Sequence, residues 1–288
     1  MDKLALHGGR KVRATPFEKQ NRYGEAELRE LKEALEQGTL FYWQGTKVKK
    51  FQTTLAEMLG KKYCTATTSG TASIHTALGA IDLGVGDEVI TSPITDIGTV
   101  VGILYQNAIP VFADLNLRTY AMEPSSIESL ITARTKAILV VHLGGHPADM
   151  DAILELAKRH NLYVIEDCAQ AWMASYKGRY VGTMGHLGAF SLNEFKHIST
   201  GDGGAVVSDD DALAAKARMF ADKYMDRVGG VRESPMLAPN YRMTELQGAV
   251  AVAQLKKVHD VCERRTAIGD KISEGINHLA GVLPPHVV

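Results

Sequence analysis

Between residues 45 and 208, short apolar runs alternate with segments whose apolar residues recur every three or four positions. Thr135 to His142 is a continuous apolar run, typical of a strand covered on both faces. Met150 to His160 follows with helical spacing, and Leu162 to Glu166 is the next apolar run. Strands that alternate with helices of about 10–15 residues predict βαβ units and a mainly parallel sheet. The predicted fold class is α/β, with the site at the carboxyl ends of the strands.

After Ala205 the alternation gives way to helical patterns. We predict a large domain with an N-terminal arm over residues 1–245. Residues 246–288 are expected to form a connecting helix and the start of a small C-terminal domain. The sequence stops directly after a helix and a turn, so we expect this small domain to be incomplete and the chain to be a fragment.

The composition excludes several classes of partner. The 32 Lys and Arg residues nearly balance the 33 Asp and Glu residues, and the net charge of −1 favours neither nucleic acid nor an anionic membrane. No stretch provides the roughly 20 apolar residues of a membrane span, and the N-terminus lacks the apolar core of a signal peptide. Three widely spaced cysteines form no disulfide or metal pattern. We therefore expect a cytoplasmic protein.

The first segment with candidate chemistry runs from Thr68 to Ala72, where a predicted strand gives way to a helix. Free N–H groups at a helix N-terminus, flanked by small side chains, can bind a phosphate. A simple capped helix start has the same pattern. The fourth segment, Asn240 to Glu245, is a polar turn before a helix, and alone it indicates only an N-cap.

The second and third segments contain ionisable groups. Asp167 closes an apolar strand, where it could hold a protonated ring nitrogen, although a helix cap or a metal-binding acid would have the same pattern. Lys196 lies between apolar residues and beside the glycine turn at residues 201–204. Desolvation there would lower the pKa of its amine and free it to form a Schiff base, whereas an isolated lysine is usually a solvated surface charge.

Taken in the order in which they occur along the chain, the four segments resemble the DegT/DnrJ/EryC1/StrS family of sugar aminotransferases, which use pyridoxal phosphate (PLP) on the fold-type I scaffold. The resemblance extends from about the first helix to the last residue. The strings that carry it are residues 69–90, 134–153, 164–191, 196–204 and 240–249.

The resemblance implies a role for each matching residue. Lys196 matches the lysine that holds PLP as an internal aldimine and then moves the proton. Asp167 matches the acid that keeps the pyridine nitrogen protonated, and Gln170 matches the residue near the 3′-oxygen of the ring. A lysine at position 196 favours transamination, because relatives that dehydrate sugars have histidine there. The adjacent His197 is out of register with the glycines that follow.

The remaining matches concern the phosphate and the assembly. Gly70, Thr71 and Ser191 match the phosphate cradle. Asn240 matches an asparagine that reaches the phosphate from the neighbouring subunit, which implies a homodimer. One departure is Asp96, which stands where the family usually has an aromatic residue that stacks on the PLP ring.

The function that this resemblance implies is the transfer of an amino group from glutamate or glutamine to a keto group. The acceptor would be a nucleotide-linked keto-sugar or a keto-cyclitol. One alternative is a PLP-dependent sugar dehydratase. The other is a catalytically silent PLP-binding or sugar-binding protein, and Asp96 and the expected incomplete C-terminal domain keep this second alternative open. The candidate substrate contacts are Asp96, Tyr42, His142 and His197.

We also considered a metal site at His142 and His146, because their spacing suits a metal. No carboxylate or cysteine stands at a suitable spacing in the sequence, so we interpret both as loop histidines and expect no metal.

Overall fold

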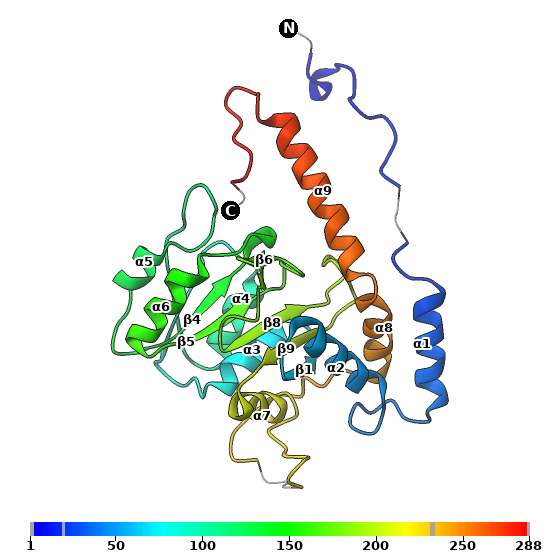
Figure 1. Cartoon of the computed structure of the whole chain (residues 1–288), viewed down its shortest axis with the longest axis vertical. Helices are drawn as coiled ribbons and strands as arrows, with labels where there is room; N and C mark the ends of the chain where they lie inside the picture. Colours follow the sequence, from blue (N-terminus) through cyan, green and yellow to red (C-terminus); the bar gives the residue numbers. More distant parts are fainter. Residues whose placement is uncertain (1–2, 19–20, 231–233, 287–288) are drawn as a thin grey trace.

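The computed structural model describes residues 3–18, 21–230 and 234–286. Its centre is a seven-stranded sheet of order β1-β9-β8-β5-β4-β2-β3 (Figure 1). The strands are β1 (Tyr63–Thr67), β2 (Glu88–Thr91), β3 (Ile109–Phe112), β4 (Thr135–Val141), β5 (Tyr163–Asp167), β8 (Leu187–Ser191) and β9 (Gly204–Ser208). Only β9 runs antiparallel to its two neighbours, so the other six strands point the same way. The predicted mainly parallel sheet is confirmed.

Helices cover both faces of this sheet (Figure 1). The α-helices are α1 (Glu25–Glu36), α2 (Lys47–Leu59), α3 (Gly70–Ala80), α4 (Ile97–Tyr105), α5 (Pro124–Ser129), α6 (Met150–His160), α7 (Asp211–Phe220), α8 (Glu245–Leu255) and α9 (Val258–Ile276). Short 3-10 turns span Ala5–His7 (η1) and Leu143–Gly145 (η2), and β6 (Ser175–Tyr176) pairs with β7 (Arg179–Tyr180) in a small hairpin.

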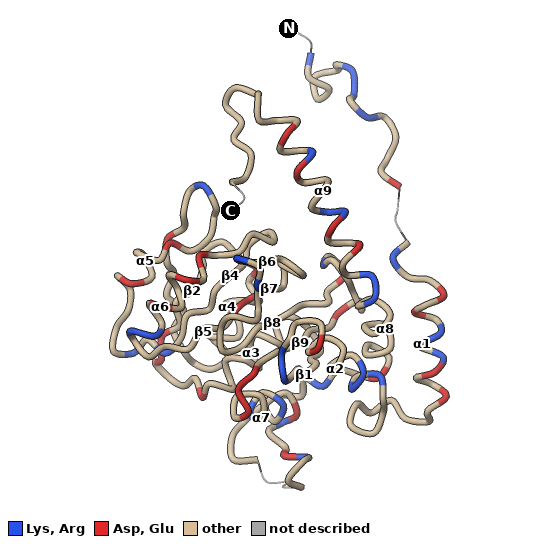
Figure 2. Tube along the Cα trace, viewed as in Figure 1, with Lys and Arg blue, Asp and Glu red and all other residues tan. Residues whose placement is uncertain are grey.

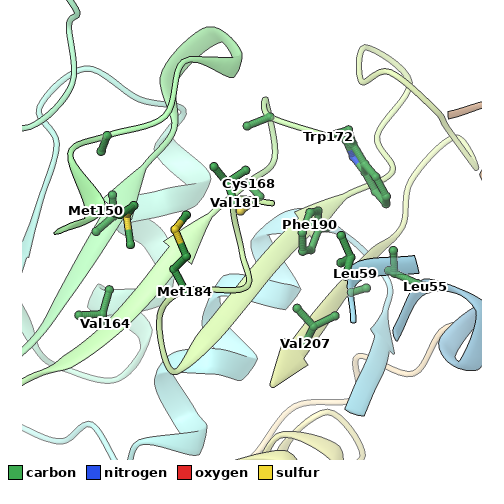
Figure 3. Close-up of a cluster of buried hydrophobic side chains, with 14 of the residues drawn as sticks. Leu55, Leu59, Met150, Val164, Cys168, Trp172, Val181, Met184, Phe190 and Val207 are labelled. Atoms are coloured by element: carbon green, nitrogen blue, oxygen red, sulfur yellow. The ribbon is translucent and has the colours of Figure 1, made fainter. Parts of the chain in front are cut away.

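The core follows the two-residue period of the strands. On β4, Ile138 and Val140 face one cluster, whereas Ala137 and Leu139 face the other. The first cluster contains side chains of α2, α6 and α8, and Figure 3 shows part of it around Trp172. The second contains side chains of α3, α4 and α7. Burial on both faces explains why the central strands are continuous apolar runs rather than alternating ones.

Two parts extend from this body in Figure 1, the N-terminal arm and the helix α9. In α9 only Val258 is buried, while Ile268 and Ile272 are 59% and 56% exposed. Lys, Arg, Asp and Glu are interspersed along α1 and α9, so neither helix has a single sign of charge (Figure 2). Among the described residues, no helix is both long and apolar enough to cross a membrane.

Candidate active site

The six strands that point the same way end at one edge of the sheet, and residues that close or follow five of them line a pocket of about 320 Å³ there. Parallel strands bring their carboxyl ends together, so residues far apart in the sequence meet at this edge. The pocket includes eight of the residues predicted for the site: Gly70, Thr71, Asp96, His142, Asp167, Gln170, Ser191 and Lys196. The sheet topology therefore assembles most of the predicted site from separate segments.

One end of the pocket is the N-terminus of α3. The Ser69 hydroxyl caps this helix by accepting the Ala72 N–H at 3.0 Å. The N–H groups of Gly70 and Thr71, in the first turn, have no acceptor within the helix. A Cβ at Gly70 would lie 2.6 Å from the Cβ of Ser191, so only glycine allows this close approach. The result is a small concave surface of donors suited to an anion.

The pocket is also lined by Asp167, which is 5% exposed. Its Oδ2 accepts a hydrogen bond from the Thr99 hydroxyl at 2.8 Å, and its Oδ1 accepts the Ala169 N–H at 3.0 Å. Burial raises the pKa of this carboxyl group. Within the described ranges, no Lys, Arg or His forms a salt bridge with it. A buried carboxylate that faces a pocket without a cationic partner fits a cationic ligand.

Lys196 is half-buried at the pocket wall. Its backbone N–H donates to the Asn193 carbonyl at 2.9 Å in a tight turn after β8. Over the part of the chain that the structure describes, its ammonium group has no carboxylate within 4.0 Å. Gln170 lines the same pocket, and its Oε1 accepts the Gly144 N–H at 2.9 Å. That bond fixes the orientation of the glutamine side chain.

His142 has a carboxylate partner, so our sequence-based statement that it lacks one was wrong. Its Nε2 lies 3.0 Å from Glu166 Oε2, and its Nδ1 accepts the Ala148 N–H at 3.2 Å. His142, Glu166 and Cys168 together form a buried group, and their atoms capable of binding a metal lie within 4.8 Å of one another. His142 directly follows β4 and Glu166 lies on the neighbouring strand β5, and sequence spacing does not show such pairs between segments.

Hydrogen bonds within the protein occupy both oxygens of Glu166. They accept the backbone N–H groups of Gly182, Met184 and Gly185 at 2.6–2.8 Å, besides the contact with His142. Burial by itself raises the pKa of Glu166, but these hydrogen bonds lower it overall. The cluster therefore fixes the loop at residues 182–185 against the sheet.

Asp96 lies at the pocket rim and is exposed. Its Oδ1 accepts the Gly98 N–H at 2.8 Å and so caps α4. The acid found in place of the usual aromatic residue is thus held by a helix N-terminus. Thr99, one turn further on, was missed by the sequence analysis. The sequence does predict that the helix containing Thr99 begins shortly after a strand end. That position could have indicated that the first turn of α4 faces the pocket.

Three predicted residues lie outside this pocket in the single chain. The Tyr42 hydroxyl donates to Asp222 Oδ2 at 2.7 Å. Asn240 is exposed on the segment before α8. His197 points to a different cavity beside α9, and its buried Nδ1 has no hydrogen-bond partner among the described residues.

A family model described as the DegT/DnrJ/EryC1/StrS aminotransferase family matches residues 21–288. The chain belongs to this family. The family, the fold class, the aminotransferase class and the PLP cofactor predicted from the sequence are thereby confirmed.

Two curated relatives and one solved structure illustrate the similarity. The chain is 36% identical to a putative L-glutamine:3-amino-2,3-dideoxy-scyllo-inosose aminotransferase of Micromonospora echinospora, over 98% of this chain and 68% of the relative. It is 41% identical to the GDP-perosamine synthase of Escherichia coli O157:H7, over 83% of this chain and 65% of the relative. NtdA from Bacillus subtilis, solved with bound PMP, superposes with a TM-score of 0.81 at 30% identity, covering 88% of this chain and 57% of NtdA. The chain thus spans about two thirds of the length of these curated relatives.

Two groups of residues in the pocket of this aminotransferase-family chain suit two parts of PLP. The donors at Gly70 and Thr71 suit the phosphate, and a side chain at position 70 would fill that space. The buried carboxylate of Asp167, which has no salt bridge within the described part of the chain, suits a protonated ring nitrogen. Lys196 lines the same pocket, as a covalent attachment requires.

Proposed function

We propose that this chain transfers an amino group from glutamate or glutamine to a keto group of a sugar-like acceptor. The observation that carries the proposal is that Lys196 and Asp167 line one pocket with the anion-binding start of α3. The acceptor class, a nucleotide-linked keto-sugar or a keto-cyclitol, draws its support from relatives named for a GDP-linked sugar and for a scyllo-inosose derivative.

When bound, PLP supplies an electron sink beside the reacting carbon. Asp167 holds a proton on the ring nitrogen by a charge-assisted hydrogen bond, and Thr99 and the Ala169 N–H fix the orientation of its carboxylate. Lys196 would hold the cofactor through Nζ, and its free amine would accept and return a proton at that nitrogen. Its position on a tight turn beside the pocket suits both tasks.

The other predicted residues bind and orient. Gly70 and Thr71 donate backbone N–H groups to the phosphate, and the Ser191 hydroxyl borders the same concave surface. Gln170, oriented by the Gly144 N–H, would lie near the 3′-oxygen of the ring. His142 has both ring nitrogens engaged within the protein, so it would contact a ligand through its ring face.

The working unit in this proposal is a homodimer in which Asn240 reaches the phosphate of the neighbouring subunit. The exposed position of Asn240, outside the pocket of its own chain, supports a contact with a second copy. Asp96, Tyr42 and His197 remain candidate substrate contacts. The division into a large domain over residues 1–245 and a further unit over residues 246–288 also remains a prediction, as does the cytoplasmic location.

Absorbance spectroscopy tests the proposal directly. Purified chain mixed with PLP should develop the visible band of a lysine-bound cofactor, and glutamate or glutamine should bleach it. Lys196→Ala should bind PLP without that band. A wild-type band that neither donor bleaches would favour the silent binder, and a band-free wild type would overturn the proposal. A dehydratase, the other alternative, is disfavoured by the lysine at position 196.

A further inference from the structure

Asp222 is a buried carboxylate that the proposed reaction does not use. It lies just after α7 and is 1% exposed. Its Oδ2 accepts the Tyr42 hydroxyl at 2.7 Å, and its Oδ1 accepts Arg242 Nη1 at 2.7 Å. Arg227 donates to both oxygens, with Nη2 3.2 Å from Oδ1. One carboxylate therefore joins side chains from three separate segments of the chain.

Asp222 is the shared counter-ion of two guanidinium groups. The Cζ atoms of Arg227 and Arg242 lie 5.0 and 5.5 Å from the ring centroid of Phe41, so both cations contact the same aromatic ring. Burial by itself would raise the pKa of Asp222, but hydrogen bonds from its partners lower the pKa overall. Without its negative charge, two neighbouring arginines would lose their shared counter-ion, which is costly in a buried network.

The backbone beside Asp222 is also bonded to the segment that carries Asn240. Asp222 and Asn240 form an antiparallel bridge. On either side of this bridge, the Lys223 N–H donates to the Pro239 carbonyl at 2.9 Å, and the Tyr241 N–H donates to the Ala221 carbonyl at 2.8 Å. The Arg242 side chain then returns to Asp222. The segment at residues 240–242 is therefore held by both backbone and side-chain bonds.

This segment borders the turn that forms the phosphate end of the pocket. The Thr68 N–H donates to the Tyr241 carbonyl at 2.9 Å, and Thr67 forms an antiparallel bridge with Arg242. The next residue, Ser69, is the N-cap of α3, whose first N–H groups face the pocket. A continuous path of hydrogen bonds thus connects Asp222 to the anion-binding turn.

We propose that Asp222 is a positioning residue for the phosphate end of the PLP site. Its charge holds Arg242, and through Arg242 the segment at residues 240–242, against the turn at residues 67–69. The inference rests on the proposed function, because it assigns the phosphate of PLP to this turn. The inference adds to the proposed function that Asp222, which lies outside the pocket, controls how tightly the phosphate of PLP is bound.

The test compares two ligands that differ only in the phosphate. Asp222→Asn keeps the size of the side chain and removes its charge. Titration of the cofactor-free protein should give a dissociation constant for PLP at least about tenfold above that of the wild type, and one for pyridoxal changed by less than about threefold. Glu128→Gln is the matched control, since it neutralises a carboxylate 2.9 Å from Arg159 between α5 and α6. It should change neither constant.

Equal weakening of both ligands would show that Asp222 merely supports the fold and would overturn the proposal, as would no change in either. If Asp222→Asn does not fold, Arg242→Lys replaces it, because lysine keeps the charge but cannot reproduce the planar contacts of the guanidinium. That variant should also weaken PLP selectively, and an unchanged constant for PLP would count against the proposal. Failure of the wild type to bind PLP would instead overturn the proposed function, so the two failures are distinguishable.

Discussion

The Thr99 hydroxyl donates a 2.8 Å hydrogen bond to Oδ2 of Asp167, joining the first turn of α4 to the end of β5. Both side chains are buried, at 1% and 5% exposure. This bond and the Ala169 N–H are the hydrogen bonds that orient the carboxylate proposed to hold the ring nitrogen. The geometry of the charged end of the pocket therefore depends on a neutral hydroxyl from another segment.

Thr99→Val removes this hydroxyl at nearly constant volume. An unsatisfied buried oxygen costs about 1–3 kcal/mol, and the pKa of Asp167 should rise further because the bond from Thr99 lowers it. We expect PLP affinity and transamination rate each to fall about tenfold, measured by titration and by the glutamate half-reaction. Thr99→Ser keeps the donor and should stay within about threefold of the wild type. Equal behaviour of the valine and serine variants would show that the bond is unimportant.

Gly70→Ala should block the phosphate end of the pocket. The added Cβ would lie 2.6 Å from Ser191 Cβ, which forces the helix start or the strand end to move. We expect a destabilisation of about 1–3 kcal/mol in urea unfolding, together with weaker PLP binding. Gly275→Ala in α9 is the control, because nothing lies within 4 Å of its Cβ, and this variant should be neutral or slightly stabilised. Unchanged PLP affinity in Gly70→Ala would exclude the phosphate assignment.

The sequence predicted the local features of this fold well and the pairings between segments poorly. Residues 150–160 were predicted as a helix and form α6 over the same range, because the apolar spacing and the caps are encoded within the segment. Asp167 could be recognised because it directly follows a buried strand. Its partner Thr99 is 68 residues away, and only the folded chain places the first turn of α4 at the end of β5. The pair formed by His142 and Glu166 was missed for the same reason.

His75 should make the folded chain less stable in mild acid. It is 5% exposed on α3, where Tyr241 and Gln106 contact its two ring nitrogens, and burial lowers its pKa from 6.5 to about 4. As the pH falls below 6.5, the unfolded chain takes up this proton and the folded chain does not. Stability contributed by the neutral ring is therefore lost progressively between pH 6.5 and about 4.

The free energy of unfolding of the cofactor-free chain should accordingly be lower at pH 5 than at pH 7. His75→Gln should reduce that difference by about 2 kcal/mol, because glutamine does not titrate. Urea unfolding at the two pH values measures it. His197, whose pKa burial also lowers to about 4, contributes in the same direction, so His75→Gln/His197→Gln should flatten the dependence further. A pH dependence that neither substitution alters would contradict this explanation.

Mixed dimers can decide whether Asn240 serves the site of the neighbouring subunit. Asn240 is exposed and absent from the pocket of its own chain, so in a homodimer it would complete the other site. One subunit with Lys196→Ala and one with Asn240→Ala would then place both lesions in a single site. The second site would combine an intact Lys196 with an intact Asn240. By symmetry, such a heterodimer should have about half the activity and half the lysine-bound PLP of the wild-type dimer.

Two affinity tags on the co-expressed subunits allow the heterodimer to be purified away from both parental homodimers. Each parent alone should lack the complete site, Lys196→Ala through loss of the covalent attachment and Asn240→Ala through weakened phosphate binding. If Asn240 instead acted on its own subunit, each site of the heterodimer would carry one lesion, and no recovery would be seen.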